Sequence, residues 1–285
     1  AVHVSQRFGA KDYDGMRNSV FNAVFLWGLI TVIITALAMI FSKPMLRLIN
    51  TPDDIIDDAQ RYILTIYAGI LAPMLYNAAS CILRAVGDSK TPLYFLLFSA
   101  ALNIVLDLVL IIVFHLGAAG AAYATVIAQG VSALLCLIYI IKKVPILKLD
   151  RWDFKLDGHL VRQQLAIGFP MALQYSITAI GAMMVQAALN VLGSVHVAAF
   201  TAANKIEQVA TQVYVALGTT MATYCAQNMG AGKYTRIRKG FKSATLIGFI
   251  YAVVTGVIIF FVGKYMTIFF VSENVNQIME YVDIY

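Results

Sequence analysis

The sequence predicts an all-α protein whose helices cross a membrane several times, and three observations support this fold class. Of its 285 residues, 60% are hydrophobic and only 13% are charged, whereas a soluble domain carries about 25% charged residues. The mean hydropathy is +0.78. The apolar residues are also gathered into long stretches, as transmembrane helices require. This composition excludes a soluble globular domain, a disordered scaffold, a disulfide-rich secreted module and a nucleic-acid-binding protein.

Seven apolar stretches are long enough to cross a bilayer, because each reaches the roughly 20 residues that a hydrocarbon core of about 30 Å requires. They are predicted to be helices, since a lone strand in lipid leaves its backbone polar groups unsatisfied. In chain order, the predicted spans are residues 20–41, 62–83, 92–114, 117–141, 165–192, 197–226 and 243–270.

Individual residues add detail to these spans. Pro73 in the second span and Pro170 in the fifth predict kinks, because proline removes one backbone donor from the helix. The fourth span opens with the small residues 117–122 and is predicted to pack closely against a neighbouring helix. All three cysteines lie inside apolar stretches, which favours packing residues over a disulfide or a metal site.

The basic residues predict the orientation of the helices. Sixteen lysines and arginines lie on the side of the membrane that contains residues 142–164, and four lie on the opposite side. Basic residues concentrate in cytoplasmic loops, so the side with sixteen is predicted to be cytoplasmic.

The chain also contains an internal repeat. Gln6-Arg-Phe-Gly-Ala-Lys-Asp-Tyr13 resembles Gln227-Asn-Met-Gly-Ala-Gly-Lys-Tyr234 at an offset of 221 residues. Six predicted spans separate the two copies, and because six is even, both copies have the same orientation. A parallel repeat of this kind is typical of secondary transporters. It predicts a fold of twelve helices in two lobes, of which this chain is a fragment that lacks the first two helices and the last ones.

On this prediction the chain has three parts. Residues 1–141 are part of an amino-terminal six-helix lobe, residues 142–164 form a cytoplasmic linker, and residues 165–285 are part of a carboxy-terminal lobe that stops in its fourth helix. The linker mixes basic residues with Trp152 and Phe154, which is typical of a segment at the membrane interface. A solvated loop anchored by Trp152 is an equal alternative.

Two carboxylates, Asp107 and Glu207, lie within complete predicted spans. A carboxylate at mid-membrane costs about 2.5–3.5 kcal/mol on insertion scales, which favours a functional role. Asn103 precedes Asp107 by four residues, so both side chains lie on one face of a helix. Together they offer oxygen ligands to a hard cation, or a proton acceptor. The alternative for Asp107 is a structural acid between helices; for Glu207, it is a polar patch neutralised by Lys205.

Motifs of enzymes are absent from the sequence. No GxSxG or HExxH motif occurs, and the four histidines show no metal-ligand spacing. Residues 229–235 match a phosphate-binding loop only in part, because Tyr234 occupies the position of its Ser or Thr. The sequence therefore predicts neither an enzyme nor a bound cofactor.

Three stretches resemble one known family: 82–93 (ILRAVGDSKTPL), 101–107 (ALNIVLD) with 116–122 (LGAAGAA), and 227–233 (QNMGAGK). In this order they are similar to the multidrug and toxic compound extrusion (MATE) transporters, and the likeness covers nearly the whole chain. The resemblance implies twelve helices in two lobes, and export of organic, often cationic compounds driven by inward Na⁺ or H⁺.

The resemblance also implies a cation site formed by Asp107, Asn103 and Thr125, with a partner aspartate on a helix that precedes Ala1. NorM-like members carry an acid in the seventh helix, but this sequence has no carboxylate between residues 164 and 204. This difference favours the DinF-like branch, with coupling concentrated at Asp107. Many members place proline after this aspartate, whereas Leu108 stands here, so a different local bend is expected.

We therefore expect a secondary active antiporter that works by alternating access, with Na⁺ or H⁺ as the coupling ion. Its expected partners are small organic cations or other amphipathic compounds and the lipid bilayer, and it is expected to be a monomer in the plasma membrane, the inner membrane of a bacterium. Four residues are candidates for the substrate cavity: Gln174, Gln186, Asn190 and Glu207. The first three are equally suited to hydrogen bonds between helices, and the polar patch described above is the equal alternative for Glu207. The alternative function is a lipid-linked oligosaccharide flippase of the same wider fold, which needs a larger and more basic cavity.

Overall fold

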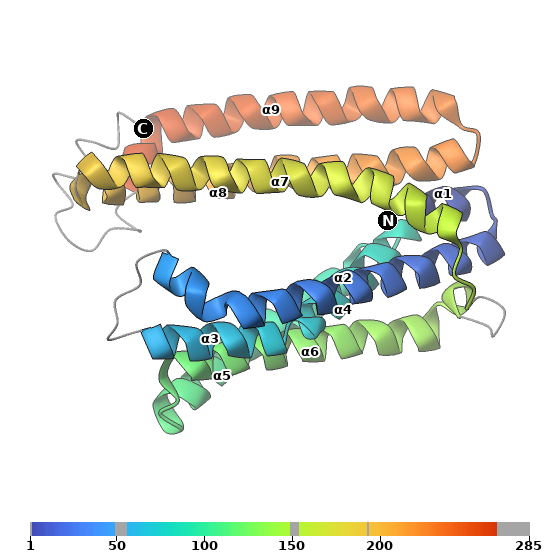
Figure 1. Ribbon diagram of the computed structural model, residues 1–285. Helices are drawn as coiled ribbons and strands as arrows, with labels where there is room; N and C mark the ends of the chain where they lie inside the picture. The colour runs from blue at the N-terminus through green and yellow to red at the C-terminus, as the bar shows by residue number, and fades with distance from the viewer. Residues whose placement is uncertain (1, 49–55, 149–153, 193, 267–285) are drawn as a thin grey trace. The chain divides into compact units, whose positions relative to one another are not determined.

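The computed structural model describes residues 2–48, 56–148, 154–192 and 194–266, and all long elements in this part of the chain are α-helices (Figure 1). The predicted all-α class is confirmed. The helices are α1 (Val2–Gly9), α2 (Tyr13–Leu48), α3 (Ile56–Ala68), α4 (Leu71–Ala85), α5 (Lys90–Leu108), α6 (Gly117–Lys143), α7 (Gly158–Leu192), α8 (Ser194–Gly230) and α9 (Tyr234–Met266).

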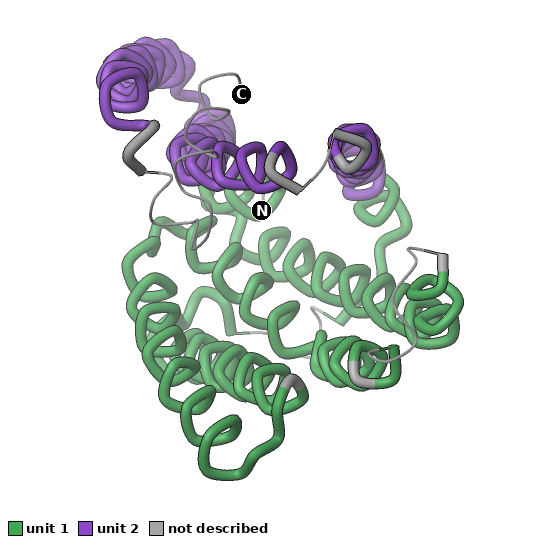
Figure 2. Tube along the Cα trace, turned by 90° about the vertical axis from the view of Figure 1, so that its left-hand side faces the viewer, with its two compact units in different colours: residues 1–162 green, residues 163–285 purple. Residues whose placement is uncertain are grey.

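The chain divides into two compact units, Ala1–Arg162 and Gln163–Tyr285, which Figure 2 colours separately. In the first unit α6 packs against α3, α4 and α5, and α2 packs against α3 and α4. In the second unit α8 packs against α9. These pairings follow from the apolar length of each helix, which must be covered either by another helix or by lipid.

Five of the helices are long and apolar enough to cross a membrane, and α3 with α4 forms a sixth, bent span. The bend is 43° and lies at Gly69 and Ile70, so the second predicted span is not one straight helix. Pro73 has no N–H to bond the carbonyl of Gly69, which instead accepts a bond from the Ala72 N–H at 3.0 Å. The predicted span 197–226 corresponds to α8, which is long enough but is not among the helices that meet the apolar criterion within the described residues.

Two side-chain hydrogen bonds fix how α5 lies against α6. The Ser99 hydroxyl donates to the carbonyl of Ala128 at 2.7 Å, and the Ser132 hydroxyl donates to the carbonyl of Phe95 at 3.3 Å. Both pairs follow the same antiparallel register. Small buried residues line this part of α6, including Ala122, Ala124 and Ala128, as close packing between membrane helices requires.

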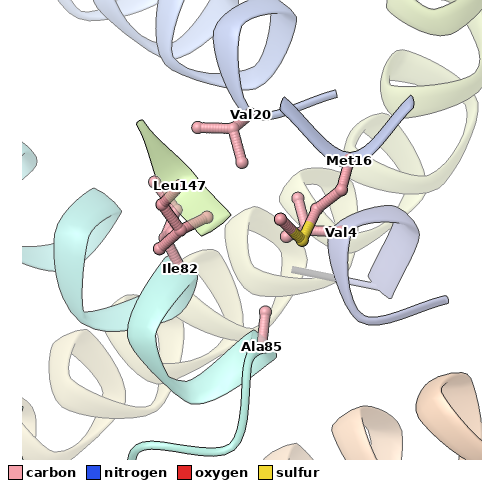
Figure 3. Close-up of a cluster of buried hydrophobic side chains, with 6 residues drawn as sticks. All are labelled: Val4, Met16, Val20, Ile82, Ala85 and Leu147. Atoms are coloured by element: carbon pink, nitrogen blue, oxygen red, sulfur yellow. The ribbon is translucent and has the colours of Figure 1, made fainter. Parts of the chain in front are cut away.

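A cluster of buried apolar side chains joins α1, α2 and α4 to the short 3₁₀ turn Pro145–Leu147 that follows α6. Figure 3 shows these side chains pointing toward one another: Val4, Met16, Val20, Ile82, Ala85 and Leu147. The turn belongs to the linker, so the beginning of the linker is packed into the first unit.

The internal repeat is visible in the backbone. Lys11 and Gly232, which are 221 residues apart, both have positive φ angles, +60° and +69°. Each follows a helix and is part of a Schellman turn, in which two backbone bonds close the helix end. The bonds are equivalent at the same offset: Asp12 N–H to Arg7 carbonyl, 3.0 Å, matches Lys233 N–H to Asn228 carbonyl, 2.8 Å. The two copies therefore share a fold as well as a sequence pattern.

The linker is shorter than the predicted range 142–164, because α6 continues through Lys143 and α7 already begins at Gly158. The early start of α7 has a local cause. The Asp157 carboxylate accepts hydrogen bonds from the backbone N–H groups of His159 at 2.8 Å and Leu160 at 3.4 Å, which satisfies donors at the helix start. Trp152 lies outside the described residues, so both predictions for its role stay predictions.

Candidate functional site

Asn103 and Asp107 lie one turn apart on α5, and both side chains are half-buried. Asn103 Nδ2 and Asp107 Oδ1 are buried atoms that have no hydrogen-bond partner in the described part of the chain. Leaving such an atom unsatisfied costs about 1–3 kcal/mol. Buried polar atoms are normally satisfied, so each exception requires an explanation. A cation or a proton bound at this position would satisfy the Asp107 oxygen, whereas the Asn103 Nδ2 is a donor and needs an acceptor atom.

The backbone changes its form directly after this pair. The α-helix continues to Leu108 and is followed by a π-helical turn, Val109–Val113, in which the Phe114 N–H bonds the Val109 carbonyl at 3.1 Å. Leu108 keeps the α-helical form that a proline at this position would bend. Turns of the π type occur frequently at functional sites, and this one follows the acid immediately.

Thr125 on α6 is the third residue that the family resemblance implies. The antiparallel register of α5 and α6 places Asn103 opposite the turn of α6 that contains Thr125. The Thr125 hydroxyl donates to the Ala121 carbonyl at 3.0 Å. A hydroxyl that donates its only proton still has lone pairs available to accept a proton or bind a cation. Its side chain is exposed in this chain.

Two polar residues that the sequence analysis did not select share a feature with this pair. Thr35 Oγ1 on α2 and Gln129 Oε1 on α6 are also buried without a hydrogen-bond partner among the described residues. Gln129 lies one turn from Thr125, on a neighbouring part of the same face. The signal in the sequence was a polar residue within an apolar span, but glutamine and threonine are common enough in membrane helices to be overlooked.

The candidate metal ligands in Asp107, Asn103 and Thr125 are all oxygen atoms. The described residues contain no group of three His, Cys, Asp or Glu side chains placed to hold a metal. One carboxylate with neutral amide and hydroxyl oxygens suits a hard ion of low charge better than a transition metal. The side chains present therefore fit Na⁺ or a proton.

The four predicted cavity residues belong to the second unit, Gln163–Tyr285. Gln174 on α7 is exposed, Gln186 on α7 is half-buried, and Glu207 on α8 is exposed. The side chain of Asn190 lies outside the described residues. The structure brings Asn103 and Asp107 together on one helix but gives no such grouping for these four, which stay predictions.

An apolar pocket of about 460 Å³ lies in the first unit at the bend between α3 and α4. Neither Asn103 nor Asp107 lines it. Its lining residues are Met39, Leu64, Thr65, Ala68, Gly69, Tyr123 and Val126. Because it contains no carboxylate, this pocket does not have the chemistry of a cation site.

Asp88, in the motif that carries much of the family resemblance, has a structural role. It follows Gly87, whose φ is +96°, and its carboxylate accepts a hydrogen bond from the Thr91 N–H at 3.0 Å at the start of α5. Burial raises the pKa of Asp88, but hydrogen bonds from Thr91 and Tyr139 outweigh it and lower the pKa overall. The motif thus forms the turn between α4 and α5.

The MatE family model matches residues 1–109 and 166–285 of this chain. The chain belongs to the MatE family. Its relatives include the probable multidrug resistance protein YpnP of Bacillus subtilis, 34% identical over 95% of this chain and 60% of that protein. A second, the FAD transporter of Shewanella oneidensis, is 28% identical over 76% of this chain and 49% of that protein. The first is named as a probable multidrug resistance protein and the second as a transporter, and neither name is that of an enzyme.

Solved structures show the same fold. A multidrug resistance MATE family transporter of the MOP superfamily in an outward-facing conformation matches with a TM-score of 0.92 at 21% identity, over 99% of this chain and 63% of that one. The chain thus spans about 60% of the length of YpnP and a similar share of this transporter structure. The predicted family and the multi-pass membrane architecture are confirmed, and the flippase alternative receives no support from these matches.

Proposed function

We propose that the natural-length protein containing this chain is a secondary active antiporter. It exports organic, often cationic, drugs or metabolites in exchange for Na⁺ or H⁺, by alternating access and as a monomer. The observation that carries this proposal is the buried Asp107 Oδ1 atom, which lacks a partner in the described residues and lies one turn from the equally unpartnered Asn103 Nδ2. The names of the relatives support the export of organic compounds.

The proposed coupling depends on the ion and the substrate preferring different conformations. A cation on Asp107 removes its net charge and the cost of its unpaired oxygen, so occupied and empty sites favour different packing of α5 against its neighbours. A tenfold difference in substrate affinity between the two conformations corresponds to about 1.4 kcal/mol. Satisfying one buried polar atom supplies about 1–3 kcal/mol, so a single site is sufficient for this coupling.

The net charge moved in each transport cycle determines whether the membrane potential contributes to export. One elementary charge moving through 100 mV is worth about 2.3 kcal/mol. If one monovalent cation enters for each monovalent cationic substrate that leaves, no net charge moves, and only the concentration gradient of the ion drives export. A neutral substrate, or two ions for each substrate, would also use the membrane potential. Gln174, Gln186, Asn190 and Glu207 are proposed as lining of the substrate cavity.

The test is ethidium efflux from proteoliposomes that contain the natural-length protein, under an imposed gradient of Na⁺ or of H⁺. We expect efflux that depends on one of these gradients in the wild type and is lost in Asp107→Asn. Clamping the membrane potential at zero distinguishes the two charge balances above. Efflux from Asp107→Asn at the wild-type rate would reject Asp107 as the coupling residue, and no efflux under either gradient would reject the antiporter.

A further inference from the structure

The linker between the two lobes is fastened to α2 by Asn22, a residue without any signal in the sequence. The Asn22 side chain is 0% exposed although it is polar. Its Nδ2 donates to the Lys155 carbonyl at 3.0 Å, and its Oδ1 accepts from the Asp157 N–H at 3.0 Å. Each end of the carboxamide therefore meets a backbone group of opposite polarity, so the contact is fully satisfied.

These two bonds have the same pattern as the bonds that a neighbouring β-strand makes to an extended segment. In an extended segment, the carbonyl of one residue and the N–H of the residue two positions later point to the same side. Asn22 binds that pair on Lys155 and Asp157, and Leu156 between them is 59% exposed. Because the contacts are made to the backbone, they set the position of the linker without depending on its side chains.

Further contacts hold the linker to the first turns of α2. Asn18 Nδ2 donates to the same Lys155 carbonyl at 3.0 Å, and the Asn22 Nδ2 also bonds the Asn18 carbonyl at 2.9 Å. The rings of Phe21 and Phe154 meet edge to face with centroids 5.2 Å apart. At the other end of the linker, Leu147 is buried in the apolar cluster of Figure 3. The linker is thus attached on both sides of residues 149–153.

Asp157 connects this attachment to α7. Its N–H is held by Asn22, and its carboxylate caps the first turn of α7 through the N–H groups of His159 and Leu160. Any shift of the linker away from α2 would therefore move the cap and the start of α7 with it. The first turn of α7, through Arg162, belongs to the same compact unit as α2.

We propose that Asn22 is a positioning residue for transport: it fixes the linker and the start of α7 to α2, so that the linker moves with the amino-terminal lobe throughout the cycle. The carboxy-terminal lobe then moves relative to a linker that stays bound to α2, and the linker does not move freely between the two lobes. The functional half of this proposal rests on the transport activity proposed above, whereas the attachment itself can be tested without transport.

The first test compares Asn22→Ala with Asn77→Ala, whose carboxamide makes a local bond to the Pro73 carbonyl of its own helix at 2.8 Å. In Asn22→Ala we expect amide hydrogen exchange at residues 155–160 to accelerate by about tenfold or more, because two hydrogen bonds are lost. The maximal efflux rate should fall while the half-saturating substrate concentration stays unchanged, as expected when a conformational step is impaired. Asn77→Ala should change neither. Unchanged exchange in Asn22→Ala would overturn the attachment, whatever the protein transports.

A second test does not remove the buried side chain. In a background without Cys81, Cys136 and Cys225, the pair Asn18→Cys and Lys155→Cys is oxidised to a disulfide between α2 and the linker. If the linker moves with the lobe, the disulfide forms and transport continues at the rate of the reduced protein. Transport that stops on oxidation and returns with a reductant would show that the linker must detach from α2, and this result would reject the proposal.

Discussion

The same helix-ending turn occurs in both lobes, yet the lobes that follow it carry different polar groups. Residues 6–12 and 227–233 share a Schellman turn with equivalent bonds at an offset of 221 residues. In the amino-terminal lobe, the intramembrane acid Asp107 is half-buried with an unpartnered oxygen; in the carboxy-terminal lobe, Glu207 is exposed. The repeat has therefore preserved backbone geometry, while the chemistry that distinguishes the lobes lies in individual side chains.

The two turns also differ in how side chains support them. At the position of positive φ, the first turn has Lys11 and the second has Gly232. At the next position, Asp12 in the first turn forms an ion pair with Arg7 and accepts a bond from the Gly15 N–H at 2.9 Å. The second turn has Lys233 at that position. One backbone form is thus supported by a capping acid in one lobe and by a glycine in the other.

Among the variants that test the difference between the two lobes, Asn103→Ala is expected to have the largest effect on the ion dependence of efflux. Replacing Asn103 with alanine removes the carboxamide one turn from Asp107 on α5, and one lost hydrogen bond or ligand to a charged group corresponds to about 1.5–3 kcal/mol. We expect the half-saturating Na⁺ or H⁺ concentration for efflux to rise by tenfold or more. Asn228→Ala in the other lobe, whose carboxamide donates to the Tyr224 carbonyl of its own helix at 2.9 Å, serves as the matched control. Equal effects of the two variants would remove the distinction between the lobes.

An exchange of residues between the two turns should change stability in opposite directions. A non-glycine residue at positive φ costs about 1 kcal/mol, so Gly232→Lys should lower the free energy of unfolding by about that amount. Lys11→Gly should raise it by a similar amount. A Cβ at Gly232 would meet no atom within 4 Å, so backbone strain is the whole effect. Unfolding by denaturant in detergent measures both, and a change of the same sign in both variants would contradict the equivalence of the turns.

Glu207→Gln should have a smaller effect. The Glu207 side chain is exposed on α8, and surface substitutions usually change free energies by less than about 0.5 kcal/mol. We expect the maximal efflux rate and its dependence on the ion gradient to stay within about twofold of the wild type, since about 0.4 kcal/mol corresponds to a factor of two. A change in the half-saturating substrate concentration is compatible with its proposed place in the lining of the substrate cavity. A loss comparable to that of Asp107→Asn would move the coupling site into the carboxy-terminal lobe.

The smallest expected effect is a loss of stability of the first turn at acid pH, which the second turn should not show. The hydrogen bond from the Gly15 N–H, followed by that from Arg7, lowers the pKa of Asp12. A carboxyl whose pKa is lowered in the folded state stabilises that state above its unfolded pKa and loses this effect as pH falls through the folded value. The first turn should therefore loosen below about pH 4, whereas the second turn, with Lys233, should not. Hydrogen exchange at residues 12–16 and 233–237, corrected for intrinsic rates, compares them.

The sequence was sufficient to predict the features that depend on hydropathy and on residue type. Apolar length located the helices, because hydropathy follows from transfer to a single solvent. The cost of a charge in lipid selects Asp107 as a candidate by the same argument, and its role stays a prediction. The bend at Gly69 was predicted only as a kink at Pro73. Its position depends on contact with α6, where a Cβ on Gly69 would lie 2.2 Å from a Val126 methyl.

Features that depend on contacts far apart in the chain were not predicted. Asn22 resembles any other polar residue near the end of a span, and its role follows from two bonds to a backbone about 133–135 residues away. The early start of α7 depends on the hydrogen bonds that Asp157 accepts at the start of the helix. Its capping role was not predicted, because the linker contains several other charged residues. Thr35 and Gln129 were missed because threonine and glutamine occur in membrane helices without special function.

The most direct test of the central claim measures ion entry that is driven by the substrate. Proteoliposomes containing the natural-length protein are given an outward substrate gradient, and the entry of Na⁺ or H⁺ is recorded for wild type, Asp107→Asn and Glu207→Gln. We predict ion entry that depends on substrate in the wild type and in Glu207→Gln, and none in Asp107→Asn. Ion entry in Asp107→Asn at the wild-type rate would contradict the account.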